Sequence, residues 1–155
     1  MSIIDTSKKN LNKAKRDFPL VFTYKNYKDI LKVKNTSLVV ISTPTKTHSQ
    51  IAKFALRNGK HVLVEKPLSL SVNDVSKLED LAKKNKKLLF VDYPFLFSGS
   101  INFIKKVIDS NKYGDLLEIE SFREQAPIRK DCNVVWDLCV HDISILNYIL
   151  KKSPK

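Results

Sequence analysis

The sequence predicts an α/β protein in which part of a parallel sheet, over residues 1–94, is followed by the start of an α+β unit over 95–155. Short all-apolar runs recur along the first 94 residues, as at Leu38–Ile41 and Leu88–Val91, and each ends in polar residues. Helical patterns of about 10–15 residues separate these runs. Strands that alternate with such helices indicate βαβ units and a parallel sheet.

The N-terminal region already shows this alternation. Ser2–Asp5 resembles the end of a strand, and a lysine-rich amphipathic stretch follows over Lys8–Asp17. A short apolar run, Leu20–Phe22, then precedes one or two helical turns over Tyr27–Lys32.

The middle of the chain carries helix start and stop signals. A helix is predicted over 47–58, and Gly59 supplies the expected stop just after it. His61–Val64 predicts a buried strand. Ser71 and Asp74 have the Ser-x-x-Asp spacing that opens a helix before the next strand run.

The pattern changes after residue 94. Apolar residues at helical spacing predict a helix over 101–108, and alternation predicts a strand over Leu116–Arg123. A final helix is predicted over 136–150. A second unit therefore begins near residue 95, and the chain ends before that unit could complete a sheet.

The chain is strongly basic, with 28 Lys+Arg against 16 Asp+Glu among 155 residues and a formal charge of +12. Only 4 of the basic residues are arginine, the residue that dominates bidentate recognition of phosphates and bases. A solvated lysine surface is therefore favoured over specific nucleic-acid binding. A nucleic-acid-binding module acting through nonspecific electrostatics stays a weaker alternative.

Two further classes are disfavoured by the sequence. Apolar runs are far too short for a membrane span, and no secretory signal pattern is present, so a cytoplasmic protein without membrane contact is expected. Cys132 and Cys139 lack the close cysteine pair of a zinc site. We expect free thiols and no metal.

Polar residues at strand ends are the first candidates for a functional site, because ligands of open parallel sheets bind outside the carboxyl ends of the strands. An acidic residue that ends an early strand is the type that holds a ribose 2′-OH in dinucleotide folds. For Asp5 alone, the interpretation that it opens the next helix has equal weight. The strand-end candidates are Asp5, Ser42, Thr43, Pro44, Glu65, Lys66, Asp92 and Tyr93.

The final predicted helix carries a second candidate pair. Asp137 and His141 are spaced i, i+4 and therefore share a helix face. A carboxylate one turn from an imidazole can orient and charge it for proton transfer near neutral pH. Taken alone, such a pair is more often a helix-start aspartate plus a surface histidine.

These motifs together resemble the Gfo/Idh/MocA family of NAD(P)-dependent sugar and cyclitol oxidoreductases. The resemblance rests on the run Val39–Pro44 with His48 after it, and on the highly specific string Gly59–Pro67. Trp136–Leu138 with His141–Ile143 is similar to the family's second signature. The resemblance implies a Rossmann-type domain over 1–94 and the start of a substrate-binding domain over 95–155.

The resemblance also implies a cofactor site. Asp5 would hold the adenosine ribose and favour NAD over NADP, and Thr43, Pro44 and His48 would line the dinucleotide. Glu65 and Lys66 would lie near the nicotinamide. The full cofactor-binding set implied in this way is Asp5, Ser42, Thr43, Pro44, His48, Glu65, Lys66 and Pro67.

The implied reaction is hydride transfer between NAD(P) and a ring hydroxyl of a sugar, nucleotide sugar or cyclitol. Lys66 would touch the reacting hydroxyl, and His141 would take its proton as acid/base. Asp137 would orient His141 or bind substrate. Tyr93 and Arg129 complete the implied substrate-binding set, although Arg129 reads equally well as an exposed loop arginine.

The sequence departs from the family at both ends. The family's Gly-rich phosphate loop should lie about 20 residues before the acidic ribose residue, yet the only glycines are Gly59, Gly99 and Gly114. We therefore expect a chain truncated at both ends, with exposed sheet edges. Marginal stability is expected unless a second copy or a complementing chain covers them. The alternative function is a non-catalytic remnant or accessory binding subunit on the same scaffold.

Overall fold

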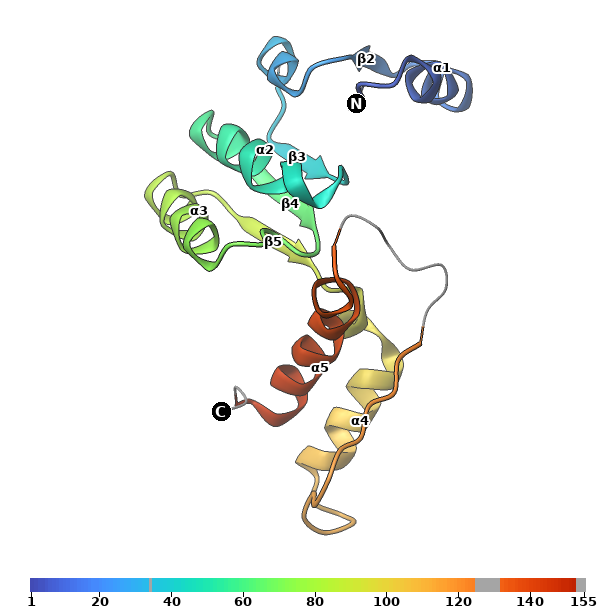
Figure 1. The fold of residues 1–155 in the computed structure, drawn as a ribbon, viewed down its shortest axis with the longest axis vertical. Helices are drawn as coiled ribbons and strands as arrows, with labels where there is room; N and C mark the ends of the chain where they lie inside the picture. The colour runs from blue at the N-terminus through green and yellow to red at the C-terminus, as the bar shows by residue number, and fades with distance from the viewer. Residues whose placement is uncertain (34, 125–131, 153–155) are drawn as a thin grey trace.

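The computed structural model describes residues 1–33, 35–124 and 132–152. Its described strands all lie between residues 2 and 92, and helices and irregular segments follow them (Figure 1). Strands alternate with helices up to the last strand, and every described strand pair is parallel. The predicted α/β class is confirmed.

A two-stranded parallel sheet opens the chain. Its elements are β1 (Ser2–Ile4), α1 (Lys8–Asp17) and β2 (Phe22–Tyr24), and a 3-10 helix, η1 (Tyr27–Lys32), follows. Ser7 caps α1 by accepting a hydrogen bond from a backbone N–H of the first turn. The helical turns predicted after β2 are therefore present.

A three-stranded parallel sheet follows, in the order β3-β4-β5. Its elements are β3 (Leu38–Ile41), α2 (Thr45–Arg57), β4 (His61–Glu65), α3 (Val72–Lys84) and β5 (Leu89–Asp92). The predicted punctuation is confirmed: Gly59 has φ +69° just after α2, and Ser71 Oγ accepts the Asp74 N–H at the start of α3.

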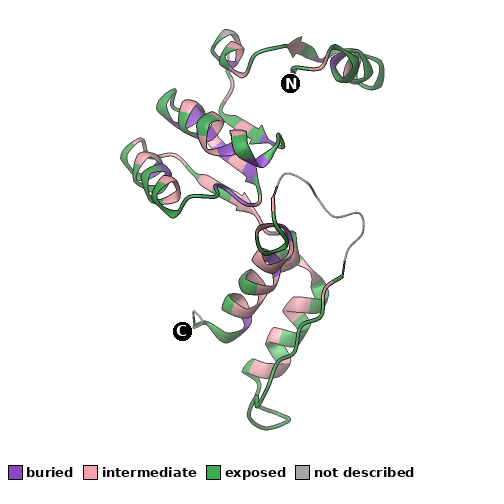
Figure 2. Cartoon of the chain, in the orientation of Figure 1, coloured by how far each residue is buried: buried purple, intermediate pink, exposed green. Residues whose placement is uncertain are grey.

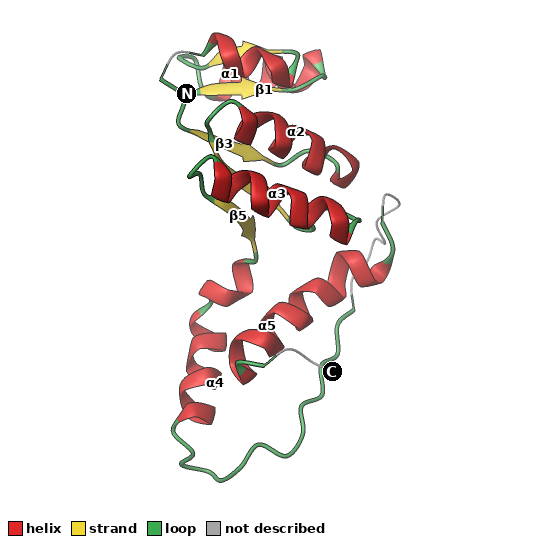
Figure 3. Cartoon of the chain, turned by 90° about the vertical axis from the view of Figure 1, so that its left-hand side faces the viewer, coloured by secondary structure: helices red, strands yellow, loops and turns green. Residues whose placement is uncertain are grey.

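The hydrophobic core lies where α2 and α3 pack on the three-stranded sheet. Figure 3 shows α1, α2 and α3 side by side along the strands, and Figure 2 shows buried residues concentrated around α2 and β4. Ala52 and Leu56 of α2 and Val62 and Val64 of β4 are almost completely buried. Each buried valine or leucine side chain contributes about 1.5–3 kcal/mol, so this cluster anchors the strand that precedes Lys66.

The single partial sheet expected from the sequence is two shorter sheets in the structure. Among the described residues, no ladder of hydrogen bonds joins β1 to β3. Leu38 and Val40 of β3 alternate with the core residues Val39 and Ile41, so they lie on the opposite face of the sheet, where they are 49% and 63% exposed. β3 has a strand partner on one side only among the described residues, and such an unpaired edge is a template for pairing with another strand.

Helices dominate the chain after β5. They are η2 (Pro94–Phe97), α4 (Gly99–Asp109), η3 (Val135–Cys139) and α5 (Val140–Leu150). The helix predicted over 136–150 is confirmed, but its first part, η3, has π-helical hydrogen bonding. α4 and α5 pack together, and Tyr148 donates a hydrogen bond to Asn102 across them at 2.6 Å. None of the described helices has the length and apolar character of a membrane span.

The strand predicted over Leu116–Arg123 is wrong. This segment is irregular, because a strand needs a neighbour to pair its backbone N–H and C=O groups and no described strand lies beside it. Ser121 and Arg123 instead hydrogen bond to Asp142 of α5, while Leu117 is 94% exposed. Ser121 and Arg123 therefore bond to a helix, whereas Leu117 of the same alternating set packs on neither a helix nor a sheet.

Candidate functional site

The candidate site begins at the carboxyl end of β4. Glu65 is the last residue of β4 and pairs with Asp92, the last residue of β5. Lys66 and Tyr93, which directly follow these two residues, therefore lie at the same edge of the sheet. The Lys66–Pro67 peptide bond is cis. The structure thus brings together two strand-end candidates that are 27 residues apart in the sequence.

Lys66 forms an ion pair with Asp137 of η3. Its Nζ donates to Asp137 Oδ1 at 2.9 Å and to the Asp137 backbone oxygen at 2.5 Å. Each of the two side chains is only 12% exposed. Solvent screens such a pair less than a surface pair, so the contact fixes the lysine ammonium and joins the sheet to the C-terminal helices.

His141 lies one turn further along, in α5, and is buried. Its ring packs edge-on against Phe95 of η2, with the ring centroids 5.0 Å apart. Its Nδ1 is buried and has no hydrogen-bond partner among the described residues, so the bond from Asp137 implied for this histidine is not made at that nitrogen. Burial, followed by the positive charges of Lys66 and Arg123, lowers the pKa of His141 below 6.5. The imidazole is therefore neutral at pH 7.

Tyr93 follows β5 and is half-buried. Burial raises the pKa of its phenol above 10.0. Its hydroxyl therefore stays protonated at neutral pH and can donate a hydrogen bond. This property suits the substrate-binding role predicted for Tyr93, which stays a prediction.

The residues after β3 divide into an exposed group and a buried one. Ser42, Thr43 and Pro44 are exposed at the start of α2. His48 is 1% exposed, and its ring nitrogens lie 2.8 Å from the Pro67 carbonyl oxygen and 2.6 Å from the Thr43 carbonyl oxygen. In this arrangement His48 connects the loop after β3 to the loop that carries Lys66.

Asp5 opens the turn that leads into α1. Its Oδ1 accepts the Ser7 backbone N–H at 2.7 Å, and its Oδ2 accepts the Asn10 side-chain amide at 2.8 Å. These contacts agree with the helix-opening interpretation. They leave acceptor capacity on both carboxylate oxygens, so the ribose-binding role stays a prediction.

The other predicted residues differ in accessibility. Glu65 is exposed, whereas Pro67 is buried. Arg129 lies outside the described residues. Sequence reasoning missed Phe95 as a contact of His141, and it missed the pairing of Arg123 with Asp142. The one available signal for the pair was the position of Asp142 directly after His141.

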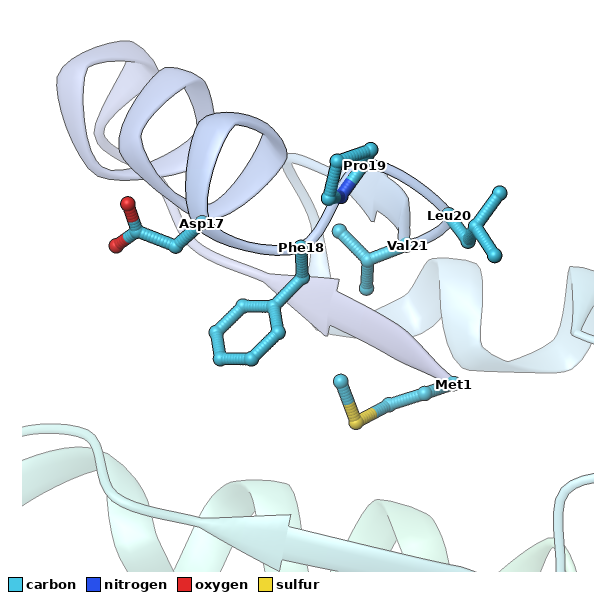
Figure 4. Close-up of a pocket in the computed structure, with 6 residues that line it drawn as sticks. All are labelled: Met1, Asp17, Phe18, Pro19, Leu20 and Val21. Carbon is cyan, nitrogen blue, oxygen red and sulfur yellow. The ribbon is translucent and has the colours of Figure 1, made fainter.

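Two hollows in the described surface lie apart from the Lys66–Asp137 pair. The first, about 340 Å³, lies beside the start of β1 and the end of α1, at the edge opposite to the strand carboxyl ends (Figure 4). The second, about 520 Å³, lies between α4, α5 and the segment 116–123, and Arg123 and Asp142 line part of it. The candidate site therefore rests on polar contacts rather than on an enclosed cavity.

Parallel strands whose carboxyl ends carry the polar cluster define the class of protein as a Rossmann-type α/β nucleotide-binding fold. The family model described as "Oxidoreductase family, NAD-binding Rossmann fold" (GFO_IDH_MocA) matches residues 1–93. The chain belongs to this oxidoreductase family.

Individual proteins agree with the family assignment. The chain is 28% identical over 156 residues to myo-inositol 2-dehydrogenase of Thermotoga maritima, a match that covers 96% of this chain and 46% of that protein. It is 34% identical over 117 residues to 1-carboxy-3-chloro-3,4-dihydroxycyclo hexa-1,5-diene dehydrogenase of Comamonas testosteroni, covering 76% of this chain and 30% of that protein.

The solved structures support the fold. The crystal structure of a probable dehydrogenase from Thermotoga maritima superimposes with a TM-score of 0.84 at 23% identity, covering 98% of this chain and 48% of that chain. Each of these three matches spans less than half of the matched protein.

Proposed function

We propose that this chain is part of an NAD(P)-dependent dehydrogenase that oxidises a ring hydroxyl of a cyclitol, sugar or nucleotide sugar. Residues 1–94 would bind the cofactor, and 95–155 would begin the substrate-binding domain. The observation that carries the proposal is the Lys66–Asp137 ion pair next to the buried, neutral His141 at the carboxyl end of the sheet. Ring hydroxyls are also the chemistry named for the myo-inositol dehydrogenase relative.

Lys66 is suited to hold the reacting hydroxyl. Its ammonium has three N–H donors, and two of them bind the backbone and side-chain oxygens of Asp137. The third N–H can donate to a substrate oxygen. The ion pair fixes where that oxygen would bind and favours an oxygen on which negative charge develops.

His141 is suited to remove the hydroxyl proton. A general base must be neutral before it can act, and the lowered pKa of His141 ensures this at pH 7. Phe95 excludes water from one side of the ring. The proton of the substrate O–H passes to the imidazole as the carbinol C–H bond breaks.

NAD, when bound, supplies the acceptor for the hydride that leaves the carbinol carbon. The residues of this chain that fit such a group are the exposed hydroxyls of Ser42 and Thr43 with Pro44, and the Asp5 carboxylate. Thr45 at the start of α2 also has a buried hydroxyl oxygen with no partner among the described residues. A carboxylate at the ribose position accepts bonds from a free diol and repels a phosphate, so we propose NAD rather than NADP.

The test is a titration of the full 155-residue chain with NADH and, in parallel, with NADPH. Binding is followed by nicotinamide fluorescence and by quenching of the single tryptophan, Trp136. We expect saturable NADH binding with a Kd at or below about 100 μM, on the order of −5.5 kcal/mol, and weaker NADPH binding. Absence of binding up to about 1 mM, from a chain shown to be folded, would refute cofactor binding by this chain.

Turnover is tested separately with NAD⁺ and a panel of cyclitols and sugars, by absorbance of the reduced nicotinamide. Lys66→Ala and His141→Gln should each abolish any turnover, and His141→Gln should leave NADH binding within a few-fold of the parent chain. NADH binding without turnover on any ring polyol would favour the accessory binding role instead.

A further inference from the structure

Phe95 contacts two nitrogen-containing side chains, the guanidinium of Arg123 and the imidazole of His141. The guanidinium carbon of Arg123 lies 4.8 Å from the centroid of the Phe95 ring, and the His141 ring meets the same phenyl ring at 5.0 Å with an interplanar angle of 80°. The three residues come from η2, from the segment after α4 and from α5. Three separate segments of the chain therefore converge on this ring.

Arg123 is itself held in place by Asp142. Its Nε lies 3.2 Å from both carboxylate oxygens, and its Nη2 lies 3.0 Å from Oδ1. Ser121 adds a hydrogen bond to the same carboxylate at 3.0 Å. A guanidinium bound through two nitrogens is fixed in orientation as well as position, so its plane over Phe95 is fixed too.

These contacts link His141 to Asp142, its neighbour in the sequence, through Phe95 and Arg123. Asp142 is the next residue after His141 in α5, and it holds the arginine that covers the ring against which His141 packs. The imidazole is thus constrained through its backbone and through the T-shaped contact of its ring with Phe95. Among the described residues, Nδ1 has no hydrogen bond that could do this.

We propose that Phe95, covered by the Arg123–Asp142 pair, is a positioning residue that orients the His141 ring and keeps water from it. The proposal rests on the function proposed above, in which His141 is the base. Edge-to-face ring contacts and cation–π contacts each stabilise one geometry over others. The first of these contacts is made to His141 itself, whose Nδ1 has no hydrogen bond among the described residues, and the second fixes the phenyl ring that makes it.

The charges that face His141 come from every neighbouring part of the site. Lys66 at the end of β4 and Arg123 lower the pKa of His141, and burial contributes most in the same direction. Asp142 on α5 and Asp137 on η3 act in the opposite sense. Phe95 matters to this balance because it maintains the burial and holds Arg123 beside the ring.

The first test is an NMR pH titration of the His141 imidazole in the full chain, assigned by comparison with His141→Gln. Phe95→Leu keeps an apolar side chain but removes the ring, so water reaches His141 and its pKa should rise toward 6.5. The matched control is Phe97→Leu, on the same 3-10 helix but 68% exposed, and it should leave the titration unchanged. Equal titration curves for Phe95→Leu and the parent chain would overturn the proposal.

A second pair of variants tests the electrostatic part and does not depend on folding of Phe95→Leu. Arg123→Gln removes a positive charge and should raise the pKa of His141. Asp142→Asn removes a negative charge and also the partner that fixes Arg123, two effects of opposite sign on the pKa of His141, so its shift should be smaller than that of Arg123→Gln. No shift in Arg123→Gln, or a larger shift in Asp142→Asn, would contradict the proposed arrangement.

Turnover separates this proposal from the function on which it rests. Where a ring-hydroxyl substrate is oxidised, Phe95→Leu should lower kcat/KM about tenfold through loss of orientation and move the acid limb of the pH profile upward. If Phe95→Leu raises the pKa of His141 as expected but the parent chain oxidises no substrate, the proposed function alone is refuted. Turnover with unchanged titration and an unchanged profile would refute the positioning role alone.

Discussion

The Lys66–Asp137 ion pair allows a direct measurement of how strongly the sheet and the C-terminal helices are coupled. The perturbation is a double-mutant cycle of Lys66→Met, Asp137→Asn and the combined variant. The two residues are 71 positions apart, and their contact joins the residue after β4 to η3. The cycle therefore reports on one defined contact between distant parts of the chain.

The expected magnitude follows from burial. Breaking a buried pair by removing one partner costs about 3–5 kcal/mol because a charge is left uncompensated. Each side chain here retains 12% exposure, so we expect a smaller loss, about 2–3 kcal/mol in the free energy of unfolding, for Lys66→Met. The coupling energy between the two sites should be about 1–3 kcal/mol.

The assay is urea unfolding followed by circular dichroism and by Trp136 fluorescence, since Trp136 adjoins Asp137. The same cycle on Lys151 and Asp109, whose side chains are 67% and 41% exposed, is the control and should show no resolvable coupling. A Lys66–Asp137 coupling that equals the control would refute the idea that this pair joins the two parts.

Three further predictions concern single residues and use urea unfolding. His48→Ala should lower the free energy of unfolding by about 2–4 kcal/mol, because it leaves a cavity and removes the contacts of the imidazole with the Pro67 and Thr43 carbonyl oxygens; the exposed neighbour Lys46→Ala should have little effect, and equal effects would contradict the role of His48 in joining the two loops. Ser71→Ala should cost about 1 kcal/mol through loss of the α3 cap, a value that an unchanged midpoint would contradict. The pKa of His141 is lowered in the folded chain, so the imidazole takes up a proton more readily in the unfolded chain. The free energy of unfolding should therefore fall as the pH drops below 6.5, and it should level off below the folded-state pKa. The parent chain should show this loss relative to His141→Gln, and a pH-independent difference between the two would contradict it.

Much of the fold was predictable because periodicity and punctuation act locally. The alternation of Leu38–Ile41, α2 and β4 identified the parallel sheet, and Ser71 and Gly59 lie at the helix ends that the sequence indicated. The error at Leu116–Arg123 has a non-local cause. A period-two pattern states which side chains share a face, but only a neighbouring strand makes the segment a strand.

The candidate site shows the same division. Strand-end positions placed Lys66 and Tyr93 at one edge of the sheet, which the register of β4 and β5 bears out. The partners of these residues depend on how the C-terminal helices pack against that edge. Helix spacing paired Asp137 with His141, whereas packing pairs Asp137 with Lys66 and gives His141 a phenyl ring as its neighbour.

The position of β4 has a consequence for amide hydrogen exchange. Of the described strands, β4 is hydrogen bonded on both sides, whereas β1, β2, β3 and β5 each have one partner. Exchange requires the backbone hydrogen bond to open, and buried central elements open least often. Deuterium should therefore enter β4 last, and Lys66, which directly follows it, extends from the slowest-exchanging segment of the chain. The Asp137 side of the ion pair can open with η3 while the lysine keeps its place.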